Sequence, residues 1–105
     1  MSNATDNMKK AYVRDYLSDS GIKANSKGYK ALYYAILEAI EHPGYSCSEL
    51  FEKAAVNLSA ENKDIVTGHV AYRNAQYAIK NSMNGSYVGG PYTFIKSCSV
   101  KLEIM

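Results

Sequence analysis

Few side chains in this sequence have the types and spacing that catalysis or metal binding requires. The candidates are two cysteines and two histidines, Cys47, Cys98, His42 and His69. Their spacing matches no zinc-ligand pattern, and no nucleophile–base set of the Ser-His-Asp or Cys-His kind is indicated. Cys47 lies near a predicted helix start, which can lower a thiol pKa, but an ordinary semi-buried thiol is the simpler interpretation. We therefore expect no enzyme, no metal and no cofactor.

A second set of polar side chains falls within one predicted helix, over residues 59–81, and has the types that contact DNA. Arginine pairs with guanine, and asparagine or glutamine with adenine, in the major groove. Lysine and threonine contact phosphates. The set consists of Lys63, Thr67, His69, Arg73, Asn74, Gln76 and Lys80. Whether these side chains act together depends on the elements that position them.

The chain of 105 residues is 47% hydrophobic and 21% charged, which suits one domain with a single modest core. Its longest apolar run, residues 31–37, is far too short to span a membrane. No secretory signal is visible, so we expect a cytoplasmic protein whose two cysteines are thiols. Residues 1–4 are interpreted as the remnant of a purification tag, and residues 5–105 as one helical domain excised from a longer protein.

The net charge of +2 is unevenly distributed along the chain. Residues 9–30 carry six Lys or Arg against two Asp, and residues 31–58 carry one Lys against four Glu. Residues 59–105 carry five Lys or Arg against three acids. This asymmetry is mild, because strong nucleic-acid binders usually have a denser basic patch. Charge alone is equally consistent with solvated helix surfaces.

Apolar periodicity predicts helices along most of the chain. The first covers residues 8–19 and ends at Gly21, which suits a left-handed cap. The second covers residues 27–41 and ends where Pro43 interrupts the helical ladder. Residues 86–105 are ambiguous, because their composition leans slightly to a β-hairpin. A helical spacing is nevertheless present in Phe94, Ile95, Cys98, Leu102 and Met105.

Two further predicted helices form a helix-turn-helix pattern. Residues 46–58 begin with a capping box at Ser46 and Glu49. Ser59 is predicted to cap a second helix that continues to about residue 81. The junction at residues 57–59 is very short, as in a helix-turn-helix whose second helix enters the major groove. Short junctions of this kind also occur in all-α proteins that bind no nucleic acid.

Ten tyrosines are present in the chain. Tyrosine carries a large apolar ring and one polar group, so it packs well at the margin of a core. This favours core packing over a partly exposed aromatic surface. Such a surface would bind a partner or stack on single-stranded bases.

Several segments, in this order and spacing, resemble the DNA-binding effector domain of the sporulation response regulator (the stage zero sporulation protein A family). Residues 17–22 (LSDSGI) and 27–36 (KGYKALYYAI) are similar to the family's opening pattern, which contains Lys/Arg-Gly-Tyr-x-Tyr-Leu-x-x-Ala-Ile. Residues 50–54 (LFEKA) lie where the family has its first helix-turn-helix helix, and residues 70–75 (VAYRNA) resemble its recognition helix. The family's closing helix is matched by Pro91, Phe94, Ile95, Lys101 and Leu102.

The resemblance implies an all-α, compact bundle of about five to six helices that contains a helix-turn-helix. It favours a helix over about residues 92–104. The partners it implies are double-stranded promoter DNA, often bound by a tandem homodimer, and an upstream receiver domain of a two-component system. The family's recognition helix is rich in arginine, whereas here only Arg73 stands at a family arginine position and Asn74 replaces a histidine. We therefore expect a divergent member that does not read the family's promoter element in the same way.

The sequence thus predicts a sequence-specific DNA-binding domain of a transcriptional regulator of the response-regulator type. Phosphate contacts are assigned to Lys27 and Lys80. The alternative is a helical protein-interaction domain of the same fold that has lost DNA binding and uses its tyrosines to bind a partner. The residues assigned to face the groove are Lys63, Thr67, His69, Arg73 and Asn74.

Overall fold

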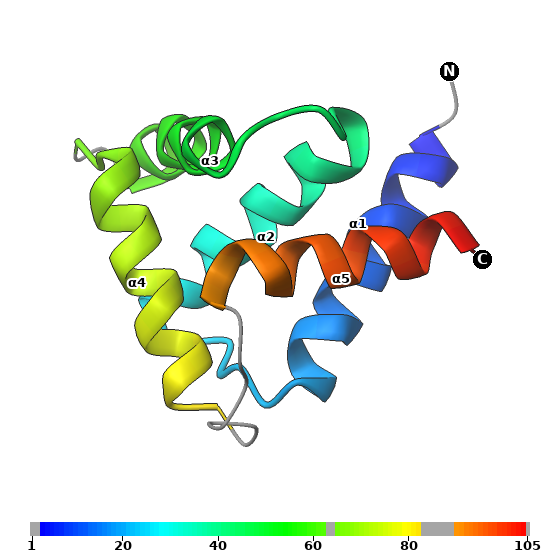
Figure 1. Ribbon diagram of the computed structural model, residues 1–105, viewed down its shortest axis with the longest axis horizontal. Helices are drawn as coiled ribbons and strands as arrows, with labels where there is room; N and C mark the ends of the chain where they lie inside the picture. The colour runs from blue at the N-terminus through cyan, green and yellow to red at the C-terminus, as the bar shows by residue number, and fades with distance from the viewer. Residues whose placement is uncertain (1–2, 63–64, 83–89, 105) are drawn as a thin grey trace.

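The structure, a computed structural model, describes residues 3–62, 65–82 and 90–104. This part of the chain folds into five α-helices and contains no β-strand, which confirms the predicted all-α bundle (Figure 1). None of these helices combines the length and the apolar character that a membrane crossing requires. The helices are α1 (Asn3–Asp19), α2 (Lys27–Glu41), α3 (Cys47–Asn62), α4 (Gly68–Lys80) and α5 (Gly90–Ile104).

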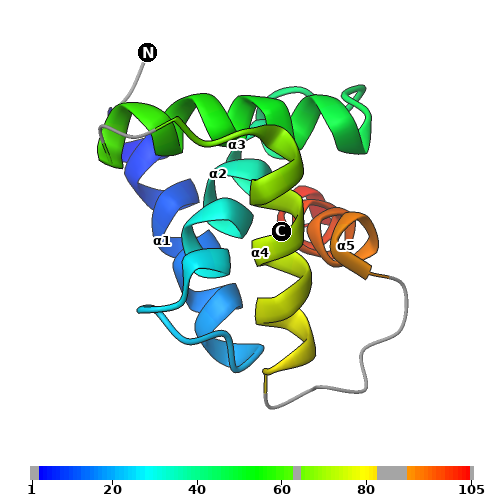
Figure 2. The same ribbon diagram turned by 90° about the vertical axis from the view of Figure 1, so that its left-hand side faces the viewer.

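Helix α2 is the centre of the bundle, because it packs against each of the other four helices (Figure 2). It has the predicted bounds and ends at Glu41, two residues before Pro43, which cannot continue the helical hydrogen bonds. Small side chains along its buried stripe let the neighbouring helices approach closely. The buried stripe consists of Gly28, Ala31, Leu32, Ala35, Ile36 and Ala39.

Helix α1 ends as predicted but begins earlier. Its C-terminal end is closed by Gly21, which has a φ of 83° and donates its N–H to the Ser18 carbonyl at 2.9 Å. Ile22 donates to the Leu17 carbonyl at 3.0 Å, which completes a Schellman motif with both apolar side chains buried. The helix begins at Asn3, five residues before the predicted start, and so includes two residues assigned to the tag remnant.

Helix α5 resolves the ambiguity of the C-terminal segment in favour of the helical spacing. The slight lean toward a β-hairpin is wrong for residues 90–104, because helical geometry places Phe94, Ile95 and Cys98 together in the core. The Phe94 ring packs edge-on against Tyr16 of α1, with ring centroids 5.2 Å apart. Pro91, buried near the helix start, suits a first-turn position where no backbone N–H is needed. Residues 86–89 of the hairpin prediction lie outside the described residues.

Most tyrosines serve the core, as the sequence favours. Tyr87 lies outside the described residues, and Tyr77 and Tyr92 are exposed. The other seven are partly buried against the core, namely Tyr12, Tyr16, Tyr29, Tyr33, Tyr34, Tyr45 and Tyr72. In the described part of the chain, the tyrosines that count as exposed are thus Tyr77 and Tyr92.

Candidate nucleic-acid interface

Helices α3 and α4 follow each other directly in the chain and run crosswise to one another (Figure 2). The start of α3 confirms the predicted capping box. The backbone N–H of Ser46 donates to the Glu49 carboxylate at 2.9 Å, and the Glu49 N–H donates to Ser46 Oγ at 3.2 Å. Phe51 of α3 then meets Tyr72 of α4 edge-on, with centroids 5.3 Å apart.

The predicted junction between these helices is wrong. Ser59 does not cap the second helix, because it lies inside α3, which continues to Asn62. Its hydroxyl accepts a hydrogen bond from the Val66 N–H at 2.8 Å and donates to the Val66 carbonyl at 3.2 Å. Ser59 therefore holds the end of the connecting segment against α3. That segment is residues 63–67, of which the structure describes 65–67.

Thr67 is the residue that caps α4. It has extended backbone geometry, and its side chain accepts a hydrogen bond from the Val70 N–H at 3.2 Å. Its carbonyl accepts from the Ala71 N–H at 3.0 Å, as expected of an N-cap residue. The second helix of the pair therefore begins at Gly68, nine residues after the predicted cap.

The last turn of α3 is fixed to α2 by Glu61. Its carboxylate accepts hydrogen bonds from the Lys30 ammonium and the Tyr34 hydroxyl, both on α2. These bonds lower the pKa of Glu61, with the Lys30 bond the larger cause, and raise the pKa of Tyr34 to about 12. This cross-link between distant segments gives a physical reason why α3 continues beyond Ser59.

Two glycines set the position of α4. A Cβ on Gly68 would lie 3.1 Å from the Glu52 side chain and 3.3 Å from its backbone nitrogen, so α4 starts tightly against α3. A Cβ on Gly28 of α2 would collide with the Asn74 carbonyl oxygen and the Ala78 side chain of α4. The backbones of α2 and α4 therefore approach too closely for any larger residue at position 28.

One continuous face of α4 points to solvent. We call it the exposed α4 face, and Arg73 lies at its centre because its neighbours are spaced at three, four and seven residues around it. Tyr77 is 60% exposed and Val70 43% exposed on this face. No residue of α4 is acidic. The face consists of His69, Val70, Arg73, Gln76, Tyr77 and Lys80.

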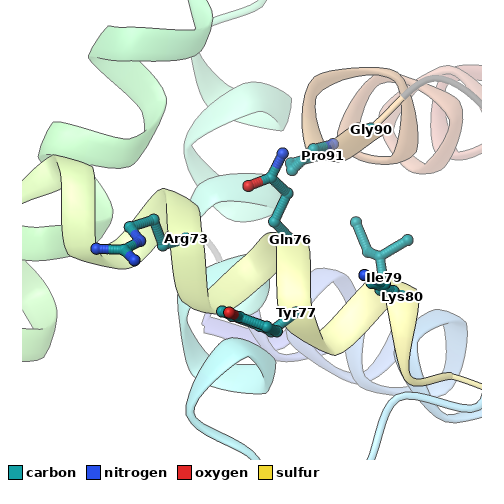
Figure 3. Close-up of a pocket in the computed structure, with 7 residues that line it drawn as sticks. All are labelled: Arg73, Gln76, Tyr77, Ile79, Lys80, Gly90 and Pro91. Atoms are coloured by element: carbon teal, nitrogen blue, oxygen red, sulfur yellow. The ribbon is translucent and has the colours of Figure 1, made fainter.

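Hollows flank the exposed α4 face on both sides. The α5-side hollow, about 510 Å³, is lined by Arg73, Gln76, Lys80 and the start of α5; Gln76 extends toward Pro91 (Figure 3). The α2-side hollow, about 520 Å³, is lined by Lys23, Lys27, Asn74 and Asn81, among others. Tyr77 lines both hollows. Neither has an acidic residue among the described residues that line it.

A third hollow, about 620 Å³, lies between the starts of α3 and α4. Cys47, Glu52 and His69 line it. Burial raises the pKa of the Cys47 thiol, which is the opposite of the lowering that a helix start can produce. The described residues contain no group of three or more His, Cys, Asp or Glu side chains placed to hold a metal ion.

The structure places the predicted contact residues that it describes in four different settings. His69, Arg73 and Lys80 lie on the exposed α4 face, and Lys27 is exposed at the first position of α2. Thr67 is exposed but acts as the helix cap. Asn74 is half-buried on the flank of α4 that faces α2. Lys63 lies outside the described residues.

Two residues of this region were missed by the sequence prediction. Tyr77 follows Arg73 by four residues, so helical spacing alone could have placed it on the same face. The sequence favours core packing for the tyrosines as a group and does not single out Tyr77. Lys23 belongs to the connection between α1 and α2, and no local pattern indicates that it lines the same hollow as Asn74.

No family model, curated protein or solved structure matches this chain. Its function is therefore inferred from the placement of its side chains and from the resemblance in its sequence.

Proposed function

We propose that this chain is a sequence-specific DNA-binding domain of a transcriptional regulator. In this proposal α3 and α4 form the helix-turn-helix, and α4 enters the major groove as the recognition helix. The observation that carries the proposal is the exposed α4 face, with Arg73 at its centre, a basic hollow on each side and no acidic residue on the helix.

The residues on this face fit distinct roles in DNA binding. Arg73 can form two hydrogen bonds to the major-groove edge of guanine, a contact worth about 1–3 kcal/mol of discrimination. His69 lies one turn closer to the start of α4, where recognition helices contact bases. Lys80 on this face, and Lys27 at the start of α2, would contact phosphates. Lys63 keeps its predicted role as a DNA contact. The side chain of Thr67 instead caps α4, and that of Asn74 lies on the flank of α4 that faces α2.

We propose in addition that the domain is a divergent relative of the sporulation response-regulator effector domains. The order of matching segments from residue 17 to residue 102 supports this. The relationship implies a receiver domain upstream and a homodimer on DNA. The loss of family arginines implies a different target sequence.

Selection of duplexes from a pool with a randomised centre, followed by fluorescence anisotropy, tests the function. We expect one sequence to be enriched and to bind more tightly than a scrambled duplex, with an affinity that falls steeply with salt. Arg73→Ala should weaken binding to the enriched duplex by about 1–3 kcal/mol and should leave binding to the scrambled duplex much less affected.

Arg14→Ala is the matched control, because it removes the same charge from the exposed surface of α1. It should bind both duplexes like the wild type. Equal weakening by the two variants would reduce the role of Arg73 to non-specific charge. Absence of enrichment, together with absence of salt-dependent binding, would contradict the proposal and favour the protein-interaction alternative.

A further inference from the structure

The two hollows beside the exposed α4 face differ in where they lie and in which elements supply their basic side chains. They lie on opposite flanks of α4, one toward α2 and the other toward α5, and Tyr77 borders both. Figure 2 shows α4 standing between these two helices. The α2-side hollow draws its cations from outside α4, whereas the α5-side hollow draws them from α4 itself.

The cations in both hollows are accessible. Lys23 and Lys27 on one side, and Arg73 and Lys80 on the other, are exposed. Among the residues that the structure describes, none of the four has an ion-pair partner. Their charge is therefore available to an external anion. Exposed amide groups of Asn81 and Gln76 add one hydrogen-bond donor group to each hollow.

The width of this arrangement matches duplex DNA. A helix with its side chains is about 10–12 Å across, and the major groove is about 12 Å wide. A phosphate backbone borders the groove on each side. A helix lying in the groove therefore presents its two flanks to opposite strands. Single-stranded nucleic acid has one backbone and would occupy one hollow.

We propose that the two hollows form a two-strand clamp, which rests on the proposed function. Lys23 and Lys27 in the α2-side hollow bind phosphates of one strand, and Lys80 in the α5-side hollow binds a phosphate of the other. The close approach of Gly28 to Asn74 fixes the α2-side lysines relative to α4. The clamp therefore sets the depth and the register of α4 in the groove, while Arg73 reads bases between the strands.

The clamp can be tested with the enriched duplex, in versions that carry one methylphosphonate linkage at a chosen position. Each such linkage removes one phosphate charge. Wild-type protein should lose affinity at a few positions on each strand of one binding site. A Lys23→Gln/Lys27→Gln variant should become insensitive to the positions on one strand only. A Lys80→Gln variant should become insensitive to a position on the other strand.

The salt dependence provides a second measurement. The slope of log affinity against log salt should become shallower by about 0.9 for each lysine that contacts a phosphate. Lys9→Gln/Lys10→Gln is the matched control for the double variant. It removes two charges in the N-terminal half of α1, a part of the helix that lies away from α4 (Figure 1). This control should keep the wild-type slope and the wild-type sensitivity on both strands.

Two results would overturn the clamp. The first is that both lysine variants lose sensitivity on the same strand, and the second is that neither loses any. If Arg73→Ala still weakens specific binding in either case, the proposed function stands without the clamp. If wild-type protein binds no duplex, the clamp and the proposed function fail together.

Discussion

At the scale of single residues, Thr67 has an observed role as the cap of α4 and a predicted role as a DNA contact, and substitutions can distinguish the two. Its side chain accepts the Val70 N–H, which would otherwise lack a partner in the first turn of α4. Thr67→Ala should therefore lower the free energy of unfolding by about 0.5–2 kcal/mol. Urea unfolding followed by circular dichroism measures this difference.

Thr67→Ser is the conservative control, because serine keeps the accepting oxygen. It should stay within about 0.5 kcal/mol of the wild type. If alanine and serine were equally stable, the cap would contribute nothing. A loss of DNA affinity in the serine variant, which keeps the cap, would instead assign Thr67 a direct contact.

The sequence predicts the positions of some residues of the candidate site better than those of others. Arg73 and Lys80 were correctly placed on one accessible helix, because helical spacing determines the face once the helix is known. Asn74 follows Arg73 directly, so it lies about a quarter of a turn away and faces α2. Its half-buried position depends on tertiary packing. Lys23 joins the site only through the packing of α2 against α4.

At the scale of elements, the spacing of α2 and α4 depends on Gly28. An added methyl group would overlap the Asn74 carbonyl and the Ala78 side chain, so the helices would have to separate. Gly28→Ala should destabilise the protein by about 1–3 kcal/mol, the usual range for overpacking, despite the higher helix propensity of alanine. The midpoint and slope of a urea unfolding curve report the change.

Gly44→Ala makes the same chemical change at a place where the new methyl group would meet nothing within 4 Å. Its stability should lie within about 0.5 kcal/mol of the wild type. A Gly28→Ala variant as stable as Gly44→Ala would mean that the two helices can separate without cost.

Helix boundaries followed from the sequence where the deciding signal was local. Pro43 ends α2 and Gly21 ends the preceding element through their own backbone preferences, so both ends were predicted correctly. The end of α3 was missed because Ser59 has the residue type of a cap. Its actual partner is Val66, seven residues away. For α5, strand propensity competed with helical spacing, and burial of the apolar positions decided the outcome.

At the scale of the whole molecule, Glu61 makes stability depend on pH. Its pKa is lower in the folded protein, mainly because Lys30 donates a hydrogen bond to the carboxylate. The stabilisation by the ionised Glu61 carboxylate is fully present above its pKa in the unfolded chain, about 4.3. It is lost as the pH falls through the lower pKa that Glu61 has in the folded protein. When the pH is lowered from about 6 to about 3, the free energy of unfolding should therefore fall by about 0.2–1 kcal/mol less in the Glu61→Gln variant than in the wild type.

Glu41→Gln is the control for this measurement, because Glu41 is an exposed carboxylate of α2 with no hydrogen bond to a described side chain. Urea unfolding at several pH values should show the same pH dependence for this variant as for the wild type. A Glu61→Gln curve parallel to the wild type would show that the cross-link between α2 and α3 contributes nothing at neutral pH.

The close approach of Gly28 to Asn74 means that the atoms that fix the position of α4 differ from the side chains that it exposes. The atoms of α4 that meet Gly28 are a backbone carbonyl and a buried methyl group. None of the three atoms nearest to a Cβ added at Gly28 belongs to His69, Arg73, Gln76 or Tyr77. An evolving lineage, or a combinatorial library, can therefore vary these four codons while the helix stays in place. Under the proposed DNA-binding function, single substitutions at these positions would change the preferred target sequence, and the placement of α4 against α2 would stay the same.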